Sequence, residues 1–166
     1  MYAVVSVILL LLCSCAGGDL PETTGGTMET NMEILSFSFS HSGMSAADCY
    51  LYSAEKEASG VRLYTEDLYY GGRTVDVLTE EALLEQLSEV VERHDIQSWN
   101  GFSKVDENVL DGTGFTLSIT FADGRSVRAK GNNAFPDGYE DAKAEICALF
   151  GELIDQYSET DQSSEN

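Results

Sequence analysis

The sequence predicts an α+β domain in which an antiparallel sheet of about five strands carries two helices packed on one face. Several segments between residues 33 and 130 alternate apolar and polar residues, which is the period of a half-buried strand. Two other segments repeat apolar residues three and four positions apart, which is the period of an amphipathic helix. Because each strand has one apolar side, both helices are expected to cover the same face and to leave the other open.

The expected order of elements is β-β-β-α-β-β-α. The first strand, 35–42, is the clearest, because Leu35, Phe37, Phe39 and His41 alternate with serines. Two strands follow around 49–55 and 61–66, with Gly60 supplying the turn between them. A short extended segment, 74–78, then leads into the first helix.

That first helix is expected to begin at Thr79, a good N-cap residue that precedes two glutamates in the first turn. Its apolar residues recur at helical spacing: Leu83, Leu84, Leu87, Val90 and Val91, with His94 at the end of the stripe. Asp123-Gly124 separates two alternating runs, 115–121 and 126–130, and so predicts a hairpin. A final amphipathic helix is expected over 137–157.

The chain begins with an apolar run over residues 3–12 that ends in Leu12-Cys13-Ser14-Cys15. About ten apolar residues suit an export signal and are too few for a membrane-spanning helix. The end of the run resembles the lipobox of bacterial lipoproteins, which implies that Cys15 carries the lipid and anchors the chain to a membrane it does not span. An ordinary secretory signal or a buried apolar segment is the alternative.

These features divide the chain into four parts. We expect a lipoprotein signal peptide at 1–14, a lipid-anchored flexible tether at 15–32, a single α+β domain at 33–157 and a disordered tail at 158–166. The expected location is the extracytoplasmic face of the cell membrane. Cys49 and Cys147 are the cysteines left in the domain, and they could either form a disulfide or fill the core as thiols.

The net charge of −20 comes from 29 acidic and 9 basic residues. Such a surface repels phosphate backbones, which argues against nucleic-acid binding. The sequence lacks a Gly-x-Ser-x-Gly elbow, a glycine-rich phosphate loop, His-Glu-x-x-His and Cys-x-x-Cys, so it predicts no catalytic residue, metal or cofactor site.

Four short motifs follow one another in the second half of the chain: Trp99-Asn100-Gly101-Phe102, Val109-Leu110-Asp111-Gly112-Thr113-Gly114-Phe115, Phe121-Ala122-Asp123-Gly124 and Gly131-Asn132-Asn133-Ala134-Phe135-Pro136. Over residues 79–157 this set resembles a domain of uncharacterised exported or lipid-anchored proteins of Gram-positive gut anaerobes. The resemblance implies no activity. It implies that Trp99, Phe102 and the Phe135-Pro136 corner belong to the domain, where we expect them to be structural.

The open sheet face is the candidate binding surface. Alternation places on it a set of tyrosines, hydroxyls and basic residues: Tyr50, Tyr52, Arg62, Tyr64, Thr116, Ser118, Thr120, Arg128 and Lys130, beside Ser36, Ser38 and Ser40. Aromatic rings with nearby polar groups suit binding of an envelope protein or glycan. The leading hypothesis is therefore a non-enzymatic binding or accessory module. An envelope hydrolase with an unrecognised site and a structural subunit of an envelope complex are the alternatives.

Overall fold

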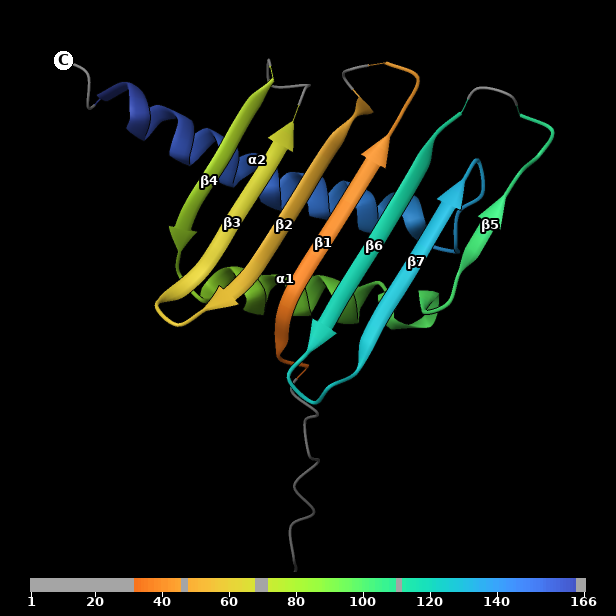
Figure 1. The fold of residues 1–166 in the computed structure, drawn as a ribbon, viewed down its shortest axis with the longest axis horizontal. Helices are drawn as coiled ribbons and strands as arrows, with labels where there is room; N and C mark the ends of the chain where they lie inside the picture. The colour runs from red at the N-terminus through yellow and green to blue at the C-terminus, as the bar shows by residue number, and fades with distance from the viewer. Residues whose placement is uncertain (1–31, 46–47, 68–71, 110–111, 164–166) are drawn as a thin grey trace, which may run out of the picture. The chain divides into compact units, whose positions relative to one another are not determined.

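The computed structural model describes residues 32–45, 48–67, 72–109 and 112–163. In these ranges it holds one mixed seven-stranded sheet of order β4-β3-β2-β1-β6-β7-β5 (Figure 1). The strands are β1 (Ile34–Ser42), β2 (Tyr50–Glu57), β3 (Gly60–Asp67), β4 (Arg73–Thr79), β5 (Ser103–Val105), β6 (Gly114–Phe121) and β7 (Ser126–Asn132). The helices are α1 (Ala82–Arg93), α2 (Tyr139–Ser163) and a short 3-10 helix, Ile96–Trp99.

The α+β class is confirmed, but the sheet is larger than predicted. The segment expected as a short extension is the full strand β4, which pairs antiparallel with β3 along its length. Strand β5 was not predicted; it pairs parallel with β7 and makes the sheet mixed. Its three residues are all exposed, so they carry no alternation by which a strand could be recognised.

Both helices lie on the same side of the sheet, as expected, and the described residues place no helix over the other side (Figure 1). Helix α1 contacts β1, β2 and α2, and α2 also contacts β4. The centre of the core is aromatic: the ring of Tyr52 stacks on Phe150 of α2 with centroids 4.6 Å apart, and Phe37 stacks on the same ring at 6.2 Å. Burial of these large rings fixes the helices on the sheet.

Two helix ends differ from the prediction. Thr79 is the last residue of β4 rather than a helix cap, and its hydroxyl accepts a hydrogen bond of 2.8 Å from Tyr157 of α2. The residue before α1 is Glu81, which makes no side-chain cap. Helix α2 continues to Ser163, so the predicted disordered tail is helical over 158–163. That stretch contains neither glycine nor proline, so nothing in it ends the helix.

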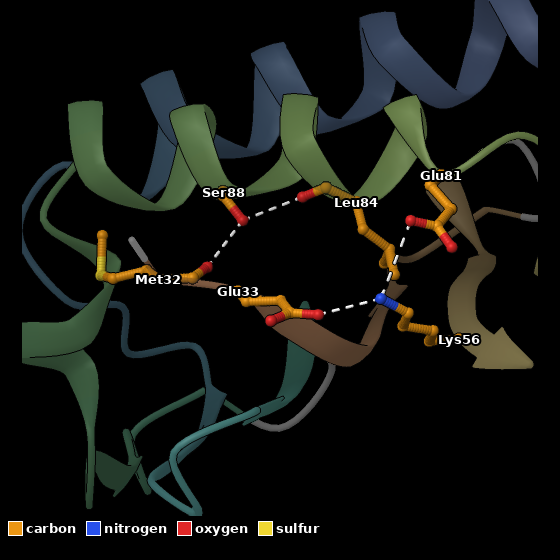
Figure 2. Close-up of polar contacts among 6 residues, drawn as sticks. All are labelled: Met32, Glu33, Lys56, Glu81, Leu84 and Ser88. Carbon is orange, nitrogen blue, oxygen red and sulfur yellow. Dashed lines mark hydrogen bonds and ion pairs between the residues drawn. The ribbon is translucent and has the colours of Figure 1, made fainter. Parts of the chain in front are cut away.

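The start of β1 is held to α1 by side chains (Figure 2). The Ser88 hydroxyl lies 2.8 Å from the carbonyl oxygen of Met32 and 2.9 Å from that of Leu84. The Lys56 ammonium on β2 lies 2.9 Å from the Glu33 carboxylate. The folded unit therefore includes Met32, one residue earlier than predicted. The predicted signal, Cys15 and residues 16–31 of the tether lie outside the described residues.

The aromatic residues of the resemblance motifs are structural, as predicted. Trp99 is 3% exposed, and its indole N–H donates to the Asp137 carbonyl oxygen at 3.2 Å. Phe102 and Phe135 are partly buried, and both rings lie against Phe115, with centroids 6.1 Å and 5.8 Å away. This cluster closes the β7 side of the core.

Candidate binding face

Two of the predicted site residues do not lie on the open face. Tyr52 is 2% exposed in the core, and Tyr50 is partly buried against it, its ring 4.8 Å from that of Tyr52. The strand register gives the reason: Tyr52 lies opposite Phe39 and Tyr50 opposite His41. Directly opposite residues of an antiparallel pair share a face, and that face of β1 is buried. The prediction that Tyr50 and Tyr52 form part of the binding surface is therefore wrong.

Hydroxyl side chains occupy the centre of the open face. Ser38 lies opposite Ser53 of β2 on one side and Ser118 of β6 on the other. We call the full set the hydroxyl strip: Ser36, Ser38, Ser40, Ser53, Thr116, Ser118 and Thr120. The predicted positions of the β1 and β6 hydroxyls are confirmed. The strip crosses three neighbouring strands, and the described residues place no helix over it.

Tyr64 and Arg62 of β3 flank the strip on one side. Tyr64 of β3 lies opposite Ser53, so it is on the open face, as predicted. Arg62 is exposed on the same face, but Asp76 occupies its guanidinium through two hydrogen bonds of 2.9 Å and 2.8 Å. That contact holds the pKa of the Asp76 carboxyl below its ordinary value of 3.8. Arg62 is therefore already neutralised by a partner within the fold.

The two cations on the other side of the strip, in contrast to Arg62, have no carboxylate partner among the described residues. Arg128 and Lys130 of β7 lie opposite Ser118 and Thr116, and both are exposed. Among the described residues, neither the Arg128 guanidinium nor the Lys130 ammonium makes an ion pair with a carboxylate. Other basic residues of the fold do make such pairs: Lys56, Arg62, Arg93, Arg125 and Lys143. In a chain with 29 acidic residues, this side of the face has retained unpaired positive charge.

A hollow of about 340 Å³ opens beside Lys130. Its lining comes from β1, β6, β7 and β5, at the strand ends that lie uppermost in Figure 1. Its floor follows two register rows. The first contains Ser40, Thr116, Lys130 and Ser103, and the second contains Ser42, Gly114, Asn132 and Val105. The hollow is thus a continuation of the hydroxyl strip with a lysine at its side.

The surface is hollow at this point because Gly114 has no side chain. This glycine occupies the position on β6 where a side chain would fill the second row, between Ser42 and Asn132. A Cβ there would lie 3.1 Å from the Ser42 hydroxyl oxygen and 3.3 Å from the Gly131 carbonyl oxygen. The position therefore tolerates a methyl group only tightly, and its absence leaves the space open.

The ionisable groups of the core form a separate cluster under the sheet. His41 is 7% exposed, and its Nδ1 lies 2.8 Å from the Tyr139 hydroxyl. The Cys147 thiol lies 3.2 Å from the Tyr50 hydroxyl. Burial lowers the pKa of His41 and raises the pKa of both tyrosines, so these groups stay neutral near pH 7. No disulfide joins Cys49 to Cys147, which answers the open question about their pairing.

The described residues contain no group of three or more His, Cys, Asp and Glu side chains that could hold a metal ion. They also contain no helix long and apolar enough to cross a bilayer. No family model matches the chain, and no curated protein is significantly similar to it.

The hollow and most of its lining were missed by sequence reasoning, although Ser40, Thr116 and Lys130 were predicted on this face. Ser42, Ser103, Asn132 and Val105 were not among the predicted site residues, because β5 was not recognised and the rows it completes depend on its pairing with β7. The available signal was Thr113-Gly114 at the start of an otherwise well-alternating strand, since a glycine at an outward position removes a side chain from a face.

Proposed function

We propose that this protein is a non-enzymatic, lipid-anchored extracytoplasmic module that binds an envelope protein or glycan through its open sheet face. The observation that carries the proposal is the hydroxyl strip, which crosses three adjacent strands in register and has no helix over it among the described residues. A row of hydroxyls can donate and accept hydrogen bonds with any polar chain laid across the strands.

The charge distribution supports the same face. Arg128 and Lys130 have no carboxylate partner among the described residues, although acidic residues outnumber basic ones threefold in the chain. An ion pair with a ligand would supply a stronger hydrogen bond than hydroxyls alone. Tyr64, on the other side of the strip, offers a ring that covers apolar area at low entropic cost.

The location is proposed from the first fifteen residues. Lipidation of Cys15 would hold the domain at the outer side of the membrane, within reach of envelope polymers. Metabolic labelling with an alkyne fatty acid tests this directly: the chain should be labelled, and Cys15→Ala should abolish the label and release the protein from the membrane. Labelling that persists in Cys15→Ala would contradict the assignment.

The binding proposal is tested with three proteins that begin at residue 16 and so keep every described residue. One is the parent, one carries Ser38→Trp in the middle of the strip, and one carries Ala144→Trp on the exposed side of α2. Tryptophan is a good strand residue, and at the half-buried Ser38 position on the open face it adds a bulky ring that blocks the face. Each is used for affinity capture from envelope extract and on a cell-wall glycan panel, with thermal melting as the check on folding.

A ligand that the parent and Ala144→Trp both hold, and that Ser38→Trp loses, would support the proposal and locate the face. Retention of the ligand by a folded Ser38→Trp variant would contradict the use of this face. No specific ligand for any of the three would contradict the binding function itself and favour a structural subunit or an enzyme.

A further inference from the structure

We infer that the hollow beside Lys130 is a subsite for a carboxylate-bearing saccharide unit of a glycan. The inference rests on the proposed function, because it names the ligand class for one end of the same face. The hollow of about 340 Å³ lies near the lower end of the range of small-ligand sites, about 300–1,000 Å³. It is large enough to receive a terminal group rather than a whole polymer.

The negative charge of the ligand is inferred from the lining. The described residues that line the hollow include Lys104 and Lys130 but no Asp or Glu. Lys104 already interacts with a ring, its ammonium 5.2 Å from the centroid of Phe102. Lys130 has no such contact and no ion pair among the described residues, so its ammonium is available for a carboxylate.

The net charge of −20 does not prevent a carboxylate from binding in contact with Lys130. Charges separated by more than about 8 Å are largely screened at physiological ionic strength. A carboxylate in the hollow meets Lys130 at hydrogen-bond distance, where the attraction is much less screened. The acidic side chains that the strand register places on the open face lie on β2, β3 and β4, across the hydroxyl strip from the hollow: Glu55, Glu57, Glu66 and Asp76.

The saccharide is inferred from the remaining lining. Ser40, Ser42, Ser103 and Thr116 offer hydroxyls, and Asn132 offers a side-chain amide, which can both donate and accept. Sugar hydroxyls need partners of this mixed kind. An acidic peptide bound in the hollow would instead need apolar pockets for its alternate side chains. Val105 is the one exposed apolar side chain in the two floor rows, which is too little for such a pocket.

The test is titration calorimetry of the chain from residue 16 with matched pairs of oligosaccharides. The probes are trigalacturonate, a hyaluronan tetrasaccharide and an alginate trimer, each compared with its methyl ester, which keeps the ring and removes the charge. The parent should bind at least one acid about tenfold or more tighter than its ester. Lys130→Gln should lose about tenfold to a hundredfold in affinity for that acid, the usual effect of a hydrogen bond to a charged group.

Lys143→Gln is the matched control, because it makes the same substitution on α2, on the side of the sheet away from the open face, where Lys143 pairs with Glu140 and does not line the hollow. It should change the affinity less than threefold. Gly114→Ala fills the floor and should weaken the acid and the ester alike. Thermal melting of each variant confirms that it is folded.

Three outcomes would overturn the inference: no acid bound by the parent, no preference for acid over ester, or unchanged affinity in Lys130→Gln. Binding of poly-L-glutamate with the same dependence on Lys130, without binding of any oligosaccharide, would assign the subsite to an acidic peptide instead. If the Ser38→Trp test succeeds while Lys130→Gln has no effect, this inference fails and the proposed function stands. If Ser38→Trp also has no effect, both fail.

Discussion

The hydroxyl oxygen of Tyr139 lies 2.8 Å from Nδ1 of His41, which joins the first residue of α2 to the central strand β1. The His41 ring also stacks on Tyr50, with centroids 5.3 Å apart. Burial lowers the pKa of His41 below its ordinary value of 6.5, and the positive charge of Lys143 lowers it further. Glu140 and Asp48 act in the opposite direction without reversing the shift. The core is therefore built around a neutral imidazole.

This contact predicts a loss of stability on mild acidification. Since the folded pKa of His41 is lowered, the unfolded chain binds more protons between that pKa and 6.5. The stabilisation by neutral His41 is complete above pH 6.5 and falls as the pH drops towards the folded pKa. Chemical unfolding at pH 7.5, 6.5, 5.5 and 5.0 should show the free energy of unfolding decreasing through this range.

The control for the histidine is His41→Gln, which keeps a polar side chain and removes the titration. Its free energy of unfolding should change less than that of the parent between pH 7.5 and 5.0. The exposed carboxyls with lowered pKa values, Asp76, Asp106 and Asp123, act in a separate window, below 3.8. An identical pH dependence in parent and variant would show that His41 does not titrate in this range.

Tyr52 and Tyr64 form a matched pair that tests which tyrosines belong to the core. Tyr52→Ala removes a ring stacked on Phe150 and should lower the free energy of unfolding by about 3–5 kcal/mol. Tyr64→Ala changes a partly exposed residue on the open face and should cost no more than about 1 kcal/mol. Urea unfolding of both variants measures the difference. Similar costs for the two would contradict the register of β2 on β1.

The orientation of β2 shows where sequence reasoning reached its limit. In β1 and β6 the apolar and polar sides differ so strongly that alternation alone placed Phe37, Phe39 and the hydroxyls of these two strands correctly. In β2 the run Cys49-Tyr50-Leu51-Tyr52 is apolar on both sides, and a shift of one residue exchanges the faces. Pairing with β1 decides between them, and that is a long-range contact which local periodicity does not contain.

The hollow was unpredictable for a related reason. Its lining comes from β1, β6, β7 and β5, and the last of these pairs in parallel with a strand more than twenty residues later. Three exposed residues give no pattern for such a pairing. The two helices and the hairpin were predictable, in contrast, because their signals lie within one continuous segment of chain.

Thr65 predicts a stabilising substitution. It is fully buried on β3, and its hydroxyl is the one buried side-chain polar atom without a hydrogen-bond partner among the described residues. Thr65→Val keeps the branched shape and removes the unsatisfied group, so it should raise the free energy of unfolding by about 1–2 kcal/mol. Thr116→Val on the open face is the control and should change it by less than about 0.5 kcal/mol. A loss of stability in Thr65→Val would mean that the hydroxyl has a partner.

Gly114 and Gly131 give opposite predictions although both line the hollow. Gly131 faces the core, where an added Cβ would collide with the Ala134 carbonyl oxygen and come within 2.7 Å of the Phe115 ring. Because a backbone oxygen cannot move aside, Gly131→Ala should lower the free energy of unfolding by about 1–3 kcal/mol.

At Gly114 the nearest atom is the Ser42 hydroxyl oxygen, 3.1 Å away on a side chain that can rotate. Gly114→Ala should therefore change the free energy of unfolding by less than about 1 kcal/mol, because the gain from restricting the unfolded chain offsets the tight contact. Denaturant unfolding of the two variants measures both costs, and a larger cost at Gly114 than at Gly131 would contradict the placement of these two glycines on opposite faces of the sheet.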